Sequence, residues 1–290
     1  MKIKKVTLAY FSGTGCTQMV ANIFESQLNN LGLQVNTINI AANDNYTDTT
    51  TDLLIILSPV YAFRLASIVE EWTHKLPKAK RTYAAIISVS GGGEVSPNTA
   101  CRVKCKQLLR QKSYKLIYEK MIVMPSNFGI QATRQMNLDL IHILPRKIAK
   151  IIDDIMQGKR NILKPKLVDR FFAVMGKAEQ LGARIFGASI RTSDACNQCG
   201  VCIKNCPKHN IKMKNGKIKF GFGCIFCMKC IYACPRKALK PRILGSLLLK
   251  DGFDMKQLIK AANQESMDQK HSYSNNISWQ GVVDYLNDDK

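Results

Sequence analysis

The first 157 residues alternate between strand-like and helix-like patterns of apolar positions. Continuous apolar runs, such as residues 53–58, are typical of parallel strands that are buried on both faces. Apolar positions spaced three and four residues apart predict helices between these runs. The alternation predicts an α/β fold with a doubly wound, five-stranded parallel sheet. The expected strands are 6–10, 35–40, 53–58, 83–89 and 116–124, and the expected helices are 17–31, 65–75, 99–111 and 136–156.

Residues 158–192 form a basic connector with its own helical pattern. Its apolar residues are spaced by four and three, which predicts an amphipathic helix. Two interpretations stay open: the helix packs across both domains, or it lies on a membrane surface, because basic residues flank the stripe. The stripe consists of Leu167, Phe171, Val174, Ala178, Leu181 and Ile185.

A twelve-residue pattern occurs twice in residues 193–242, which we assign to a small α+β domain. The two copies are CNQCGVCIKNCP at 196–207 and CIFCMKCIYACP at 224–235. Between them, IKMKNGKIKF predicts a β-hairpin that turns at Asn215-Gly216. Residues 243–290 form a polar tail with two expected short helices, near 255–262 and 279–286, to which the sequence assigns no function.

Each copy of the pattern reads C-x2-C-x2-C-x3-C-P, which is the spacing of [4Fe–4S] ligands. Three thiolates bind one cluster, and the fourth binds the other cluster in two-cluster ferredoxins. Structural zinc prefers two separated cysteine pairs. The sequence therefore predicts two [4Fe–4S] clusters, one held by Cys196, Cys199, Cys202 and Cys234, the other by Cys224, Cys227, Cys230 and Cys206.

The cysteine module resembles the bacterial two-cluster ferredoxin family over residues 193–242. Members of that family are commonly acidic, whereas residues 196–250 contain 12 basic and no acidic residues. Because nearby cations stabilise a reduced, more negative cluster, we expect raised reduction potentials. The same charge favours an acidic redox protein as partner.

The whole chain of 290 residues carries a formal net charge of +22. It contains no apolar run long enough to span a membrane and no recognisable signal peptide, so we expect a cytoplasmic protein. In that compartment its 11 cysteines favour metal or redox roles over disulfides. Nucleic-acid binding is not expected, because no helix-turn-helix or basic–aromatic motif is present. The sequence does not predict an oligomeric state.

A loop after the first expected strand has the features of a phosphate site. In YFSGTGCTQ (residues 10–18), hydroxyl side chains and two glycines open a helix, whose N-terminus favours an anion. The loop is neither a dinucleotide fingerprint nor a P-loop. It supplies Ser12, Gly13, Thr14, Gly15, Cys16 and Thr17.

Two further loops follow the third and fourth strands, beside the switch point where ligands of such sheets bind. One offers an aromatic ring and the other a side-chain-free backbone, so that together with the phosphate loop they predict FMN. The predicted contacts are Pro59, Val60, Tyr61, Ala62, Phe63, Ser88, Ser90, Gly91, Gly92 and Gly93.

Residues 3–157 resemble the flavodoxin family, and the whole chain is similar to flavodoxin–ferredoxin fusion proteins of anaerobic bacteria and archaea. The motifs are YFSGTGCT, SPVYAFR and MPSNFG (residues 124–129), followed by the double cysteine pattern. The resemblance implies that residues 12–17 bind the FMN phosphate and that the isoalloxazine lies between residues 59–63 and 88–93.

Three cysteines lie outside the ligand pattern. Cys16 stands where the flavodoxin family usually has asparagine. A thiol at a helix N-terminus has a lowered pKa, so a reactive thiol is one interpretation of Cys16. Cys101 and Cys105 lie four apart on one helix face and are expected to be small buried hydrophobic residues.

FMN takes one or two electrons and each cluster takes one, so the combination predicts an electron-transfer protein that relays single electrons between two [4Fe–4S] clusters and FMN. The alternative is a flavin-dependent reductase of a small molecule such as a quinone. No residue pattern supplies a general acid, base or nucleophile, which leaves enzymatic activity open.

Anaerobically purified protein is expected to contain about eight irons and one flavin per chain, because two four-iron clusters and one FMN account for the motifs. Iron, sulfide and flavin assays with an absorption spectrum measure this. Colourless protein, or protein that holds zinc in place of iron, would contradict the assignment.

Overall fold

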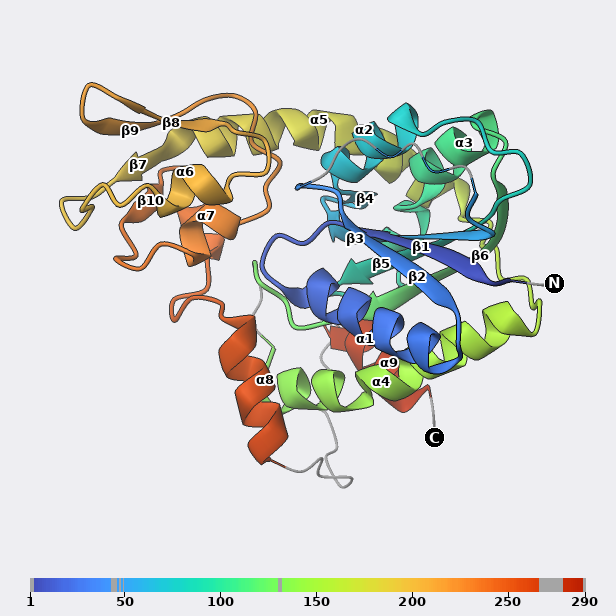
Figure 1. Ribbon diagram of the computed structural model, residues 1–290. Helices are drawn as coiled ribbons and strands as arrows, with labels where there is room; N and C mark the ends of the chain where they lie inside the picture. The colour runs from blue at the N-terminus through green and yellow to red at the C-terminus, as the bar shows by residue number, and fades with distance from the viewer. Residues whose placement is uncertain are drawn as a thin grey trace.

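The computed structural model describes residues 3–42, 46, 48, 50–129, 132–265 and 279–288, without the side chains of 172–180. Five parallel strands form the main sheet in the order β2-β1-β3-β5-β6 (Figure 1). This is the flavodoxin-like order 2-1-3-4-5, and the predicted doubly wound sheet is confirmed. The strands are β1 (Lys5–Tyr10), β2 (Gln34–Asn39), β3 (Leu53–Tyr61), β5 (Tyr83–Ser90) and β6 (Lys115–Val123).

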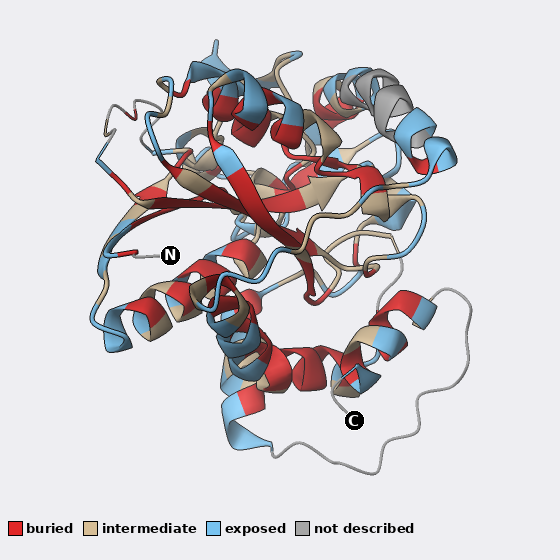
Figure 2. Cartoon of the chain, turned by 90° about the vertical axis from the view of Figure 1, so that its right-hand side faces the viewer, coloured by how far each residue is buried: buried red, intermediate tan, exposed pale blue. Residues whose placement is uncertain are grey.

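Helices cover both faces of this sheet, and each strand contributes alternate residues to the two sides. In β3, Leu53, Ile55 and Leu57 pack with helices α1 and α4. Leu54 and Ile56 face the opposite side, against α2 and α3. Figure 2 shows the buried strands between the two layers. The helices are α1 (Cys16–Asn30), α2 (Ser67–Lys75), η1 (Asn98–Ala100), α3 (Val103–Gln111) and α4 (Arg134–Met156).

A short hairpin after β3 is absent from the sequence prediction. Strand β4 (Arg64–Leu65) folds back on the end of β3, so helix α2 begins at Ser67 instead of near residue 65. The two turn residues, Ala62 and Phe63, have φ angles of 51° and 60°. Such turns usually contain asparagine or glycine, and the sequence here gives no such signal.

The small domain follows helix α5 (Leu167–Ser189). Strands β8 (Ile211–Lys214) and β9 (Lys217–Phe220) form the predicted hairpin, with Asn215 and Gly216 at positive φ in its turn. Strand β7 (Ile190–Thr192) lies within the predicted connector but pairs with β10 (Leu239–Pro241) of this domain. Helices α6 (Val201–Asn205) and α7 (Lys229–Tyr232) complete it.

Helix α5 connects the two domains, as one interpretation of the connector predicted. Near its start, Asp169 accepts hydrogen bonds from the hydroxyls of Ser96 and Thr99. Near its end, Phe186 lies in the core of the small domain. The expected apolar stripe, however, faces outward: Leu167 is 80% exposed and Leu181 58%. The helix therefore packs through a different face from the one that its apolar pattern suggests.

The tail returns to the flavodoxin-like domain through the two predicted helices. After η2 (Gly245–Leu247), helix α8 (Met255–Gln264) packs against α1 and α4. Helix α9 (Gln280–Asn287) packs against α4 and the end of β6. The tail thus ties the small domain to the sheet in addition to α5.

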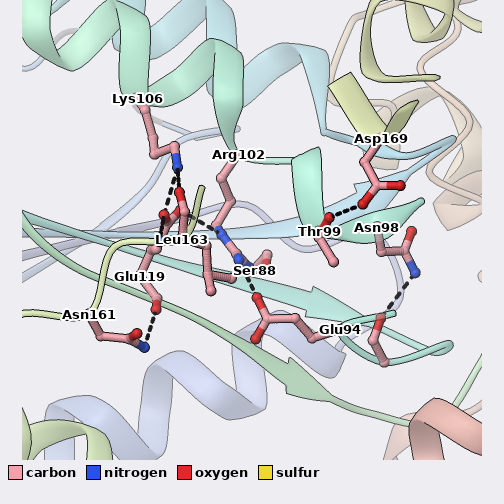
Figure 3. A network of polar contacts seen from close by, with 11 residues as sticks. Ser88, Glu94, Asn98, Thr99, Arg102, Lys106, Glu119, Asn161, Leu163 and Asp169 are labelled. Carbon is pink, nitrogen blue, oxygen red and sulfur yellow. Dashed lines mark hydrogen bonds and ion pairs between the residues drawn. The ribbon is translucent and has the colours of Figure 1, made fainter. Parts of the chain in front are cut away.

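A buried ionic network connects α3 to β5 and β6 (Figure 3). Arg102 has no exposed surface, and its guanidinium binds the carboxylates of Glu119, at 2.9 Å, and Glu94, and the hydroxyl of Ser88 at 2.6 Å. Lys106 contacts the second oxygen of Glu119 at 2.6 Å. Removing one partner of such a pair leaves a charge buried without compensation.

Arg102→Met is therefore expected to lower the free energy of unfolding by about 3–5 kcal/mol, measured by urea denaturation. The control is Arg134→Met, which removes an ion pair between side chains that are 66% and 45% exposed. It should change stability by less than about 1 kcal/mol. Equal effects of the two substitutions would contradict a structural role for the buried network.

Candidate cofactor sites

A cleft opens at the carboxyl ends of the parallel strands, where ligands of this fold bind. The cleft has about 750 Å³ of empty space, counting its open mouth. The loops after β1, β3, β5 and β6 form its walls. Polar groups lie along the loop of residues 12–17, and Tyr61, Val89 and Phe128 supply apolar and aromatic surface elsewhere. One anionic group and one flat ring system fit this distribution.

The loop after β1 has a defined internal structure. The Ser12 hydroxyl accepts a hydrogen bond from the Gly15 N–H at 3.1 Å, and the Thr14 hydroxyl accepts one from the Asn127 side chain at 2.6 Å. Gly15 has a φ of 106°, which glycine adopts without strain. The first turn of α1 contains no acidic residue. The loop is therefore suited to an anion at the helix N-terminus.

Cys16 does not have the properties of a reactive thiol. Burial raises its pKa to about 12. Its Sγ lies 3.7 Å from the carbonyl oxygen of Pro125 and 3.7 Å from the sulfur of Met255. The lowered pKa expected at a helix N-terminus is thus wrong, because desolvation outweighs the helix end. Cys101 and Cys105 are 1% and 0% exposed, which confirms that they are buried hydrophobic residues.

The two cysteine repeats have matching backbones. Residues at equivalent positions, 28 apart, adopt the same left-handed conformation. In both copies the fourth cysteine accepts a backbone N–H from four residues downstream: Asn210 donates to Cys206 and Ala238 to Cys234, each at 3.3 Å. Such bonds to sulfur help set a cluster's potential. The left-handed pairs are Gln198 and Phe226, Gly200 and Met228, and His209 and Lys237.

Cys206 lines one cavity together with Cys224, Cys227 and Cys230. Burial raises the pKa of the Cys224 thiol, and the nearby Cys206 sulfur raises it further. Burial also raises the pKa of Cys202, and the nearby sulfurs of Cys234 and Cys196 raise it further. Each fourth cysteine thus lies near a thiol of the other repeat's triplet, and the crossed ligand sets stay a prediction.

No three His, Cys, Asp or Glu side chains among the described residues come close enough together to hold a single metal ion. A four-iron cluster is a larger body, and its ligands lie further apart than those of one ion. Burial and neighbouring sulfurs raise the pKa of Cys227 to about 12, so binding iron there must displace the thiol protons.

The loop of residues 224–230 lies directly against the cleft. A Cβ atom on Gly13 would lie 2.6 Å from the Tyr61 hydroxyl and still closer to the Cys227 carbonyl oxygen. Cys227 packs in the same core cluster as Phe11. Phe226 lines the cleft itself. Only glycine at position 13 permits this approach of the two backbones.

Further contacts hold the two domains in this arrangement. Phe226 packs edge-to-face with Phe128 and with Phe186, with ring centroids 4.7 Å apart in each pair. The Tyr232 hydroxyl donates to the Asn127 carbonyl at 2.7 Å. Cys199 of the other repeat is exposed. The loop that carries Cys227 therefore lies at the cleft, whereas Cys199 is exposed on the small domain.

Residues 195–239 match the family model described as 4Fe-4S dicluster domain. This segment is a 4Fe–4S dicluster domain. The chain therefore joins a flavodoxin-like domain to a dicluster domain, as its resemblance to fusion proteins predicted. No curated protein matches the chain.

Several solved structures are similar to the flavodoxin-like domain. A Fusobacterium nucleatum flavodoxin bound to flavin mononucleotide is 14% identical, with 55% of this chain and 100% of that chain covered and a TM-score of 0.39. A Bacillus anthracis azoreductase is 8% identical over 52% of this chain and 100% of its own, with a TM-score of 0.41. At these scores the similarity carries no argument, and the fold assignment depends on the strand order.

Most of the predicted FMN contacts lie at the cleft, but five do not line it. Ser88 is buried and its hydroxyl binds Arg102. A side chain on Gly93 would collide with Gly281 of α9. Gly15, Phe63 and Gly92 also lie outside the lining. The predicted residues that do line the cleft are Ser12, Gly13, Thr14, Cys16, Thr17, Pro59, Val60, Tyr61, Ala62, Ser90 and Gly91.

Sequence reasoning missed two parts of the lining. Residues 124–128 follow the last strand of the sheet, and the rule that ligands bind at strand ends could have included them. Phe226 comes from the dicluster domain, and no sequence pattern indicated that it reaches the cleft.

Substitution of the fourth cysteines tests the crossed ligand sets. Cys206→Ser is expected to disrupt the cluster bound by residues 224–230, and Cys234→Ser the cluster bound by residues 196–202. Each variant should lose about half of its iron, and electron paramagnetic resonance of the reduced protein should identify a different remaining cluster in each. Identical remaining signals would contradict the crossed assignment.

Proposed function

We propose that the chain is an electron-transfer protein in which the dicluster domain exchanges electrons with an FMN in the cleft of the flavodoxin-like domain. The observation that carries the proposal is the approach of the Cys227 carbonyl to Gly13. It brings one set of cluster ligands to the wall of the cleft. The sites then follow in order from the surface: the Cys199 set, the Cys227 set and the cleft.

The cleft fits FMN by its chemistry. The helix N-terminus and hydroxyl groups of residues 12–17 would hold the phosphate, while Tyr61 and Val60 would lie against the ring. When bound, FMN exchanges one or two electrons, and each [4Fe–4S] cluster exchanges one. The chain itself supplies the positions of the sites and their electrostatic surroundings.

Aromatic side chains fill the region between the near cluster ligands and the cleft. Phe226 lies beside the ligand Cys227 and contacts Phe128 across the domain boundary. Its partner Phe186 is 1% exposed. The rings place apolar surface beside the cysteines, and a lowered local dielectric strengthens the effect of nearby charges on the potentials.

The dicluster segment is basic, and one of its cysteines reaches the surface. Cys199 is exposed, and residues 196–250 contain 12 basic and no acidic residues. An acidic redox protein would be attracted to this surface, and the interaction would weaken as ionic strength rises. We therefore assign partner exchange to the Cys199 end of the dicluster domain.

Stopped-flow absorbance under anaerobic conditions tests this order. Oxidised holoprotein is mixed with a reduced acidic ferredoxin as one-electron donor. We expect Cys206→Ser to slow flavin reduction at least about tenfold, because it removes the cluster beside the cleft. The control is Cys105→Ala, which changes a buried cysteine outside the ligand sets.

Unchanged flavin reduction in Cys206→Ser would overturn the proposal. Steady turnover of a quinone by the same holoprotein and donor would instead favour the reductase alternative, in which the cleft also admits a small acceptor.

A further inference from the structure

The outward face of α5 carries large apolar residues at both of its described ends, residues 167–171 and 181–185. Leu167 is 80% exposed, Leu181 58% and Ile185 44%, and their spacing places them on one side of the helix. Phe171, on the same side, is 64% exposed. Large apolar residues exposed on one side of a helix are typical of a surface that binds a protein or a membrane.

The opposite face of α5 is already used by the protein. Asp169 is 2% exposed and binds Ser96 and Thr99, while Phe186 is 1% exposed in the dicluster core. The helix is thus held at both ends, and Leu167, Phe171, Leu181 and Ile185 face outward; we call these four residues the ridge. From residue 167 to 185 this ridge is about 27 Å long at ~1.5 Å per residue.

Exposed cations flank the ridge. In the sequence, residues 158–192 contain eight basic and two acidic residues. Asp169, one of the two acids, is buried and hydrogen-bonded, so it adds little negative charge to the outer surface. The exposed basic residues around the described ends of the ridge are Lys164, Lys166, Arg170, Arg184 and Arg191.

We propose that the outer face of α5 binds the surface of an anionic lipid bilayer. An amphipathic helix with large apolar residues between Lys and Arg lies in the plane of the membrane interface, where the apolar side chains enter the headgroup region and the cations meet anionic lipids. The exposed cations around the described ends of the ridge complement anionic lipid headgroups.

This binding is peripheral. No helix in the described part of the chain is long and apolar enough to cross a membrane. A bilayer along α5 would lie beside the dicluster domain, which packs on the C-terminal end of the helix (Figure 1). The inference depends on α5 alone and is independent of the proposed electron-transfer function.

Vesicle flotation with the full-length holoprotein tests the proposal. We expect the protein to float with vesicles of phosphatidylcholine containing phosphatidylglycerol, and not with phosphatidylcholine alone. Leu167→Glu combined with Leu181→Glu should weaken binding at least about tenfold, because charged side chains do not enter the apolar interface. Arg170→Gln with Arg184→Gln should weaken it several-fold, with a reduced dependence on salt.

Matched controls distinguish the face from general effects. Leu31 is 58% exposed, like Leu181, but lies after α1, so Leu31→Glu should leave flotation unchanged. Lys256 is exposed on α8, and Lys256→Gln should also have little effect. Iron content and melting temperature of each variant show that it has folded.

Three outcomes would overturn the proposal. The first is no flotation, or equal flotation with neutral vesicles. The second is flotation that the double leucine variant retains. The third is a dimer that this variant dissociates without any vesicle binding, since the face would then bind a second copy of the chain.

Discussion

The backbones of two domains approach closely at Gly13 and Cys227. This contact sets the position of the dicluster domain against the cleft of the flavodoxin-like domain. The absence of a side chain on Gly13 lets the Cys227 carbonyl and the Tyr61 hydroxyl reach the loop that opens α1. The loop of residues 224–230 thereby lies against the cleft, and its Phe226 forms part of the wall. Other contacts between the domains lie near this one, including Phe226 with Phe128 and Tyr232 with Asn127.

Three further connections join the dicluster domain to the flavodoxin-like domain. Helix α5 joins the domains through Asp169 at one end and Phe186 at the other. The Tyr232 hydroxyl binds the loop after β6. Helix α8 brings Met255 against Gly15 and Cys16, so the tail closes the underside of the predicted phosphate loop. A single chain with three such connections holds its domains more firmly than a flexible linker would.

Sequence reasoning was most successful where one local pattern determines the structure. The five parallel strands, the hairpin at Asn215-Gly216 and the dicluster motif all follow from hydrophobic period, turn chemistry or ligand spacing. It failed where the outcome depends on tertiary packing. The Ala62-Phe63 turn has positive φ without asparagine or glycine, and the thiol of Cys16 is governed by burial.

In the candidate site, too, local patterns were predicted correctly and features that depend on tertiary packing were not. The loops after β1 and β3 were identified from composition and topology, because parallel strands end at one edge of the sheet. Ser88 was predicted to contact FMN, but its side chain does not line the cleft, because its hydroxyl accepts a hydrogen bond from the buried Arg102. Phe226 could not be found at all, because its place depends on how the second domain packs on the first. Likewise, the apolar pattern of α5 predicted a helix, but not that Leu181 would face outward.

The rate of flavin reduction after rapid one-electron reduction of the dicluster domain, compared between Gly13→Ala and the unaltered protein, tests the central contact most directly. Gly182→Ala is the control, since a Cβ there meets no atom within 4 Å. With iron and flavin content unchanged, flavin reduction should be at least about tenfold slower in Gly13→Ala, because the added methyl group must separate the two loops. The control should reduce its flavin at the rate of the unaltered protein. Equal rates in all three proteins would contradict this account.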